Sequence, residues 1–107
     1  SADLRTSFYS VLSSVGQALA DSPGQVTVAG HTDNVPVAFS ERFQSNWDLS
    51  AARSASVADY LVGEGLVEPG AVTVTGYADT VPVASNDTAA GRAQNRRIEI
   101  TVKGGAG

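Results

Sequence analysis

Two short stretches of this sequence place an aspartate in the same local context. Residues 30–37 read GHTDNVPV and residues 76–83 read GYADTVPV, so both fit the pattern G-x-x-D-x-V-P-V. The first phrase also contains His31, the single histidine of the chain, and no cysteine occurs. A carboxylate at Asp33 or Asp79 can bind a cation, and next to an imidazole it can also serve acid–base chemistry. The chemistry of each phrase therefore depends on the charged side chains that the fold brings to it.

Metal and catalytic sites find little support among these residues. A zinc site would need carboxylates for almost all its ligands, and no G-x-S-x-G motif accompanies a possible Ser-His-Asp triad. Asp33 with Asp79 is the one pair of acids that suits glycoside hydrolysis, and the spacing of a phosphate-binding glycine loop is missing. We expect His31 to fix the strand-end turn by hydrogen bonding. We expect no metal and no cofactor, and these residues alone leave a catalytic role of Asp33 with Asp79 or His31 as a weak alternative.

Arg53 is the cation that we expect to face Asp33. It falls in the first turn of the second predicted helix, where the helix dipole disfavours a cation by about 0.3–1 kcal/mol, so its position suggests that it serves an anion. Free backbone N–H groups at a helix start also attract anions. A carboxylate and a guanidinium set close together would recognise the ammonium and the carboxylate of a zwitterion. The alternative is a plain Asp33–Arg53 salt bridge, worth about 0–1 kcal/mol if exposed.

Hydrophobic periodicity predicts the elements that position these charges. Apolar side chains between Leu4 and Leu19 recur at the spacing of one helix face, and Ser-Pro-Gly at 22–24 ends that helix. Residues 25–29 then alternate as a strand that leads into the first phrase. In both phrases we expect a Gly-led turn and a Val-Pro exit at a strand end.

The connection 34–46 is a candidate functional loop. It has no clear period and is long for a small domain. Its Phe39 and Phe43 either line a groove for a ligand or pack down as a small cluster that anchors the loop. We favour packing.

The second helix is predicted to begin with Asp48 or Ser50 as its N-cap and to run to about Glu64, before Gly65. Its core-facing residues would be Val57, Ala58, Leu61 and Val62.

The remaining elements follow the second phrase. Residues 71–75 repeat the strand pattern that precedes it. Residues 85–95 predict a short third helix, capped near Asp87 or Thr88, and residues 97–102 alternate as a last strand. The order of helices and strands predicts an α/β two-layer sandwich with helices packed on a small mixed sheet.

The second phrase has different charged neighbours from the first. Asp79 is followed by Arg92, Arg96 and Arg97, which can tie the third helix to the sheet by ion pairs. Arg97 and Glu99 share one face of the last strand and can pair with each other. We expect Asp79 at the rim of the domain, where it closes a turn or pairs with a nearby arginine. The two phrases are therefore predicted to be unequal.

Length and composition limit the possible functions. The chain has 107 residues, which suits one domain, predicted at 1–103 with a disordered tail at 104–107. Its net charge is −4 with only seven Lys and Arg, which argues against binding of nucleic acid. No apolar run is long enough to span a membrane, and the first residues do not have the layout of a signal peptide. We expect a cytosolic protein or a soluble domain excised from a longer one.

The sequence resembles a known family over about residues 4–102. The runs GHTDNVPV, SNWDLSAARSASVADYL and VTGYADTVPVASNDTAAGRAQNRRIEI are similar to the OmpA-like peptidoglycan-binding domain. The forms D-N-V-P and S-N-W-D-L-S-A-A-R favour its flagellar motor stator B branch (MotB type). The resemblance implies an OmpA-C-like sandwich that binds peptidoglycan noncatalytically, through diaminopimelate in the peptide stem.

The resemblance also assigns site residues. Asp33 would accept the ligand ammonium, and Arg53 would hold the ligand carboxylate. The other positions that it assigns to the ligand-binding site are Thr32, Asn46, Leu49, Ser50, Asn95 and Arg96.

Further expectations concern the whole protein. The resemblance implies a periplasmic homodimer whose parent is held in the inner membrane by an N-terminal helix and contacts a stator A subunit through that segment. The connection 34–46 is longer than in the lipoproteins of the family, which bears on access to the site. The alternatives are another OmpA-like envelope anchor, a cell-wall hydrolase that uses Asp33 or Asp79 with His31, and a purely structural dimerisation domain.

Overall fold

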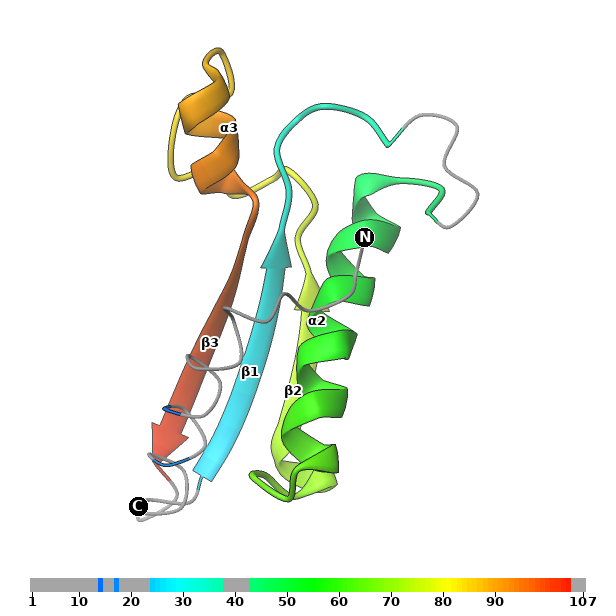
Figure 1. Cartoon of the computed structure of the whole chain (residues 1–107), viewed down its shortest axis with the longest axis vertical. Helices are drawn as coiled ribbons and strands as arrows, with labels where there is room; N and C mark the ends of the chain where they lie inside the picture. Colours follow the sequence, from blue (N-terminus) through cyan, green and yellow to red (C-terminus); the bar gives the residue numbers. More distant parts are fainter. Residues whose placement is uncertain (1–13, 15–16, 18–23, 38–42, 105–107) are drawn as a thin grey trace.

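The computed structural model describes residues 14, 17, 24–37 and 43–104 (Figure 1). Ser14 and Gln17 are helical and exposed, in agreement with their polar positions in the first predicted helix. The rest of that helix and Phe39 lie outside the described residues. Phe43 is only 8% exposed, which agrees with the prediction that it packs down.

Three strands form a mixed sheet in the order β2-β1-β3. The central strand β1 (Gly24–His31) is parallel to β2 (Val72–Gly76) and antiparallel to β3 (Arg97–Gly104). The C-terminal ends of β1 and β2 therefore meet the start of β3 at one end of the sheet. We call this the upper end, and it is uppermost in Figure 1.

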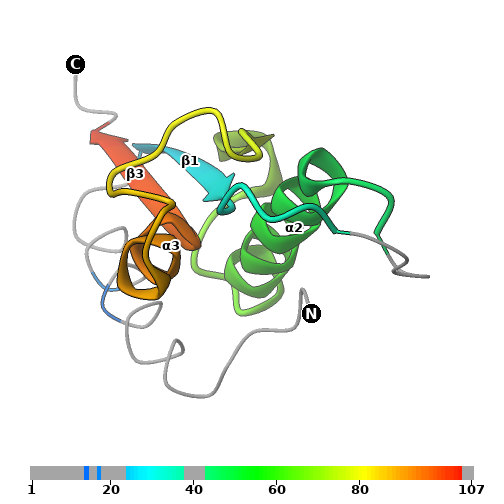
Figure 2. The same cartoon turned by 90° about the horizontal axis from the view of Figure 1, so that it is seen from above.

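The helix α2 (Asn46–Gly63) covers one face of the sheet (Figure 2). Val57 and Leu61 of α2 are fully buried against Val26 and Val28 of β1, as the periodicity predicts for the two helix residues. Burial stabilises the fold by about 1.5–3 kcal/mol for each such side chain. Residues that pack around this core are Tyr60, Leu66, Val67, Val72, Ile98 and Ile100. Ala58 and Val62, also predicted for the core, are only partly buried.

The start of α2 differs from the prediction. Its N-cap is Ser45, whose side chain accepts a hydrogen bond from the Asp48 amide at 3.2 Å. The Asp48 carboxylate in turn accepts a hydrogen bond from the Gln44 amide at 3.1 Å. Asp48 and Ser50 are thus helical residues and not N-caps, and the Ser45 side chain satisfies one of the free amides of the first turn.

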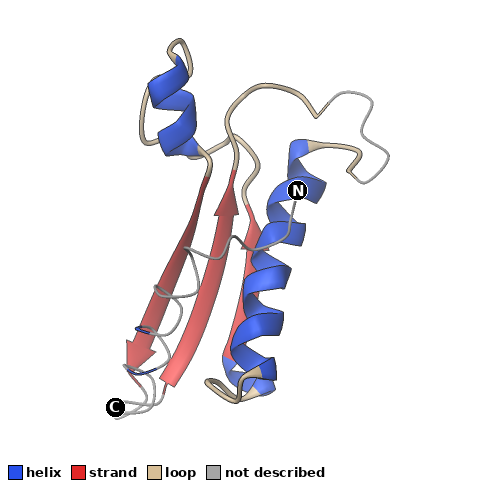
Figure 3. Ribbon diagram, in the orientation of Figure 1, coloured by secondary structure: helices blue, strands red, loops and turns tan. Residues whose placement is uncertain are grey.

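The helix α3 (Ala89–Asn95) lies at the upper end, next to the start of β3 (Figure 3). Its N-cap is Thr88, whose hydroxyl accepts a hydrogen bond from the Gly91 amide at 3.0 Å, as predicted for one of the two candidate caps. A short 3₁₀ helix, η1 (Pro69–Ala71), precedes β2.

The predicted fold class is confirmed: within the described residues α2 packs on one face of a three-stranded mixed sheet, which gives two layers. The predicted tail needs one correction, because β3 continues through Gly104. Positions 105–107 lie outside the described residues. Within the described part of the chain, no helix combines the length and the apolar character needed to cross a membrane.

Candidate functional site

The glycines that open the two phrases are partners in the sheet. Gly30 and Gly76 pair in register across the parallel strands β1 and β2. A Cβ atom at Gly30 would lie 2.3 Å from the Ser50 carbonyl oxygen, and one at Gly76 would lie 2.6 Å from the Ala51 amide nitrogen. The predicted Gly-led turn is therefore wrong. Both glycines lie in strands, and each is needed because the backbone of α2 approaches closely.

Hydrogen bonds hold the two phrases side by side beyond these glycines. The Thr32 amide donates to the Ala78 carbonyl at 2.8 Å, and the Thr32 hydroxyl donates to the Asp33 carbonyl at 2.8 Å. The buried Ser50 hydroxyl accepts from the Ala78 amide at 3.0 Å and so ties the second phrase to α2. Ala78 has a φ of 55°, the left-handed region that a residue other than glycine rarely adopts. The buried residues Thr32 and Ser50 thus fix the backbone of the upper end by hydrogen bonds.

Asp33 carries an anchored carboxylate at the upper end. Its Oδ1 accepts a hydrogen bond from the Val35 amide at 2.9 Å, and its Oδ2 accepts one from Nη1 of Arg96 at 2.7 Å. The Asp33 side chain is 10% exposed and that of Arg96 is 45% exposed. The ion pair therefore joins a nearly buried anion to a cation that reaches solvent.

The pairing of Asp33 with Arg96 was not predicted from the sequence, from which Arg53 was expected to face Asp33. The adjacency arises because β1 and β3 are antiparallel, with His31 opposite Arg97. Asp33 lies just beyond the end of β1 and Arg96 lies just before β3. This position of the two residues relative to their strands was a usable signal, since antiparallel pairing brings a strand end next to a strand start.

Arg53 lies about two turns beyond the start of α2 and is half-buried. Its predicted place in the first turn is wrong, so the argument from the helix dipole does not apply to it. Nearby Ser54 donates to the Thr75 carbonyl at 2.9 Å, which places this turn of α2 against the end of β2. The role of Arg53 as a carboxylate contact stays a prediction.

Asn46 joins the first phrase to α2. Its Nδ2 donates to the Asp33 carbonyl at 3.3 Å and to the Val35 carbonyl at 3.1 Å. Leu49, also predicted for the site, is half-buried in the first turn and its amide donates to the Ser45 carbonyl at 3.0 Å. The start of the helix therefore fixes the backbone on which the Asp33 carboxylate is mounted.

Asn95 is fully buried, and its side-chain amide is saturated with hydrogen bonds. Its Oδ1 accepts from the amides of Val83 and Ala84 at 2.8 and 3.0 Å. Its Nδ2 donates to the Ala84 carbonyl at 3.0 Å and to Oδ1 of Asn86 at 2.8 Å. Asn95 therefore holds the segment 83–86 and positions Arg96, the next residue.

His31 lies in an enclosed environment. It is 2% exposed, and its ring stacks on Tyr77 with a centroid distance of 5.2 Å and an interplanar angle of 9°. No described residue forms a hydrogen bond with either ring nitrogen, so the predicted role of fixing a turn by hydrogen bonding is wrong. Burial lowers the pKa of His31, the positive charge of Arg97 lowers it further, and Glu99 opposes both.

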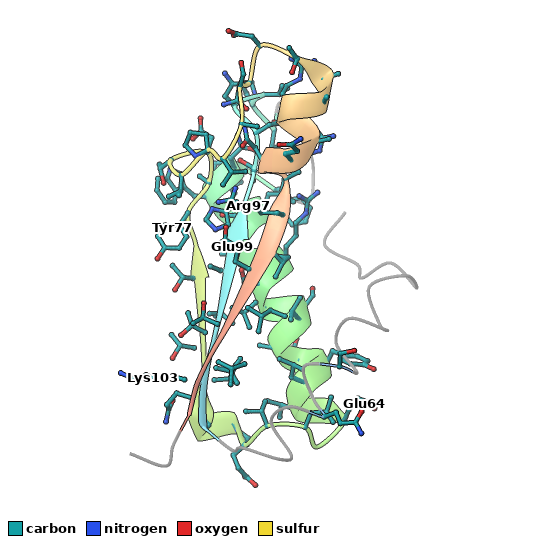
Figure 4. The ribbon with its side chains drawn as sticks, turned by 90° about the vertical axis from the view of Figure 1, so that its left-hand side faces the viewer. Glu64, Tyr77, Arg97, Glu99 and Lys103 are labelled. Carbon is teal, nitrogen blue, oxygen red and sulfur yellow. The ribbon has the colours of Figure 1, made fainter. Side chains whose placement is uncertain are left out.

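Glu99 and Arg97 form the ion pair predicted on β3, and they lie near Tyr77 in Figure 4. The hydrogen bond from Arg97 lowers the pKa of Glu99. The Glu99 carboxylate is also 3.8 Å from Nε2 of His31. His31, Arg97 and Glu99 are close in sequence to Asp33 and Arg96, but their contacts form a cluster separate from the Asp33–Arg96 pair.

Asp79 differs from Asp33 as predicted, because it is exposed. Its turn is closed by Thr80, whose amide and hydroxyl both donate to the Tyr77 carbonyl, at 3.1 and 2.7 Å. Among the described residues, none forms a hydrogen bond or ion pair with the Asp79 side chain, so its predicted role in closing the turn or pairing with an arginine is wrong. The described part of the chain also contains no group of three or more His, Cys, Asp or Glu able to hold a metal.

Comparisons with known proteins show which family and which solved structures the chain resembles. The profile of the OmpA family matches residues 1–96. Motility protein B of Bacillus subtilis is 41% identical over 80 residues, which cover 75% of this chain and 30% of that protein. The peptidoglycan-binding protein ArfA of Mycobacterium tuberculosis is 43% identical over 95 residues, covering 88% of this chain and 27% of that protein. The chain spans less than a third of the length of these two curated relatives.

Solved structures show the same fold. The cell wall anchor of the type VI secretion system (T6SS) from Pseudomonas aeruginosa is 48% identical, with a TM-score of 0.86, over 97% of this chain and 71% of that one. The periplasmic domain of Helicobacter pylori MotB is 28% identical, with a TM-score of 0.86, over 99% of this chain and 68% of that one.

Proposed function

Since the chain belongs to the OmpA family, we propose that it is a noncatalytic module that binds peptidoglycan and anchors an envelope assembly to the cell wall. The names of two relatives support this proposal, one being a peptidoglycan-binding protein and the other a cell wall anchor. The chain would act in the periplasm, as the MotB domain does.

The observation that carries the proposal is the nearly buried Asp33 carboxylate at the upper end, which pairs with Arg96 just before β3. A carboxylate and a guanidinium provide the charges that complement an ammonium and a carboxylate on one ligand carbon. Diaminopimelate in the peptide stem has this arrangement. In the proposed complex Asp33 accepts its ammonium and Arg53 holds its carboxylate.

The other assigned residues support this site in different ways. Thr32, Asn46 and Ser50 use their side chains to fix the backbone around Asp33. Leu49 contributes the first turn of α2, and Asn95 positions Arg96 at the border of the site.

A flagellar stator is the first candidate for the anchored assembly, because MotB proteins occur among both the sequence and the structural relatives. The parent protein would then form a homodimer, held in the inner membrane by an N-terminal helix and joined to a stator A subunit. A secretion-system anchor is the second candidate, because the relative that is 48% identical is the T6SS cell wall anchor. Complementation of motility in cells without a stator B subunit, by this chain fused to that subunit's membrane segment, would distinguish the two.

Co-sedimentation with purified sacculi tests the proposed binding. A small polar site of this kind should bind with a Kd of roughly micromolar to millimolar, and a dimer should be retained much better than a monomer. We expect Arg53→Ala to abolish co-sedimentation while circular dichroism shows a folded chain. Retention of wild-type binding by this variant would reject the assignment of Arg53.

A second assay tests the absence of catalysis. Intact sacculi incubated with the chain should release no soluble muropeptides, while a lytic enzyme added in parallel releases them. Release by the chain, lost in His31→Phe or Asp33→Asn, would favour the hydrolase alternative over the anchor.

A further inference from the structure

We propose that Arg96 makes this site selective for zwitterionic ligands over simple cations, by occupying the Asp33 carboxylate until a ligand ammonium replaces it. The proposal rests on the proposed function, because it concerns the same site and the same class of stem peptide. It adds to that function a residue that decides between two kinds of stem, one ending in diaminopimelate and one ending in lysine.

Both oxygens of the Asp33 carboxylate are already engaged. Oδ1 accepts from the Val35 amide at 2.9 Å, and Oδ2 accepts from Arg96 at 2.7 Å. With the side chain only 10% exposed, little of the carboxylate is open to a new donor. A ligand ammonium therefore reaches Asp33 only if the Arg96 guanidinium moves aside.

Arg96 is placed so that it can move. Its side chain is 45% exposed, and within the described residues its guanidinium has Asp33 as its one hydrogen-bond partner. The neighbouring Arg97 provides a contrast, because its side chain is 16% exposed and donates to Glu99, to the Asn95 carbonyl and to the Val81 carbonyl. Arg97 is held in place by several contacts, whereas Arg96 is held by one.

The exchange has a different outcome for the two classes of ligand. A lysine ammonium that displaces Arg96 gains one ion pair with Asp33 and destroys another, so its net gain is small. A ligand with an ammonium and a carboxylate replaces the lost pair through its ammonium, and its carboxylate, which Arg53 holds in the proposed complex, also accepts from the freed Arg96 guanidinium. For the ligand with both charges, one ion pair is thus replaced by two. Arg96 therefore disfavours binding of ligands that carry an ammonium without a carboxylate.

Affinities of three stem tripeptides test this exchange. The probes end in diaminopimelate, in lysine, which lacks the second carboxylate, and in 2-aminopimelate, which keeps that carboxylate and lacks the ammonium. Each is titrated into the wild-type chain and the Arg96→Gln variant, and the amide signals of Thr32 and Val35 are followed by NMR. The apparent Kd of a ligand equals its intrinsic Kd divided by the fraction of sites that an internal competitor leaves free.

We expect Arg96→Gln to tighten binding of the lysine probe by about three- to tenfold, the range set by a partly exposed ion pair. The 2-aminopimelate probe should bind the variant more weakly than it binds the wild type. The preference for diaminopimelate over lysine should therefore fall. Unchanged or weaker binding of the lysine probe to Arg96→Gln, including no binding at all, would overturn the proposal.

Two variants control for charge. Arg96→Lys keeps a cation that can pair with Asp33, so it should gain much less for lysine than Arg96→Gln does. Lys103→Gln removes a positive charge near the opposite end of β3 and should leave all three affinities unchanged (Figure 4). An equal gain in Lys103→Gln would attribute the effect to net charge and overturn the exchange. Failure of the wild-type chain to sediment with sacculi would reject the proposed function. The role of Arg96 is decided by a different measurement, the titrations of the wild-type chain and Arg96→Gln with the lysine probe.

Discussion

Gly30 and Gly76, the first residues of the two matching phrases, are paired across parallel strands and both lie against one turn of α2. Their shared environment explains why the phrases are alike at this position. Their different neighbours, a nearly buried ion pair at Asp33 and an exposed turn at Asp79, explain why the phrases are unequal as sites.

Replacement of Gly30 by alanine should destabilise the fold. The added Cβ would meet the Ser50 carbonyl at 2.3 Å, and a backbone atom cannot move away as a flexible side chain can. We expect the free energy of unfolding in urea to fall by about 1–3 kcal/mol or more. Gly63→Ala is the matched control, because nothing lies within 4 Å of its Cβ and alanine favours the helix by about 0.5–1 kcal/mol. Equal stability of the two variants would contradict the close approach of α2.

Acidification should destabilise the chain through His31. Its pKa in the folded state lies below the ordinary value of 6.5 because the imidazole is buried beside Arg97, so the unfolded chain takes up this proton first. The contribution of His31 is fully present above about pH 6.5 and is lost as the pH falls below it. Glu99 titrates at lower pH, because its pKa is held below its ordinary value.

Urea unfolding at pH 7.5 and pH 5.5 measures this effect. His31→Phe keeps an aromatic ring next to Tyr77 and removes the titrating group. The wild-type chain should lose more stability between the two pH values than this variant does. An equal loss in both chains would show that the buried imidazole does not govern the acid response.

Asn95→Ala should cost more stability than its position in a short helix suggests. The variant leaves two backbone amides and one carbonyl of the segment 83–86 without their partners in a partly buried setting. We expect a loss of about 2–4 kcal/mol in the free energy of unfolding, since each unsatisfied buried group costs about 1–3 kcal/mol and water recovers part of it. The exposed neighbour Gln94, changed to alanine, should differ from the wild type by less than about 0.5 kcal/mol.

The ion pair of Asp33 and Arg96 should appear as a coupling energy in a double-mutant cycle. We expect Asp33→Asn and Arg96→Gln to be coupled by about 0.5–1.5 kcal/mol in urea unfolding, decreasing as salt is added. The partly exposed arginine limits the energy, and the nearly buried aspartate keeps it measurable. Coupling below about 0.3 kcal/mol would mean that the two groups are not paired in solution.

Much of the fold was predictable because short-range interactions decide it. Alternating β-branched residues predict the strands, and the hydroxyl of Thr88 predicts the start of α3. The Arg97–Glu99 pair on β3 was predictable for the same reason, since residues two apart on a strand share a face. The start of α2 was predicted too late, because Ser45, Asp48 and Ser50 can each cap a helix and the choice depends on the chain that precedes them.

The sequence by itself determined the elements, their order, and the charged residues that carry the proposed chemistry. Only the tertiary structure decided which charges meet, because strand order and register join residues that are far apart in the chain. Antiparallel pairing of β1 with β3 brings Arg96 to Asp33, and parallel pairing of β1 with β2 brings Gly30 to Gly76. The burial of His31 likewise depends on Tyr77 and Glu99 from neighbouring segments, which no local pattern around His31 contains.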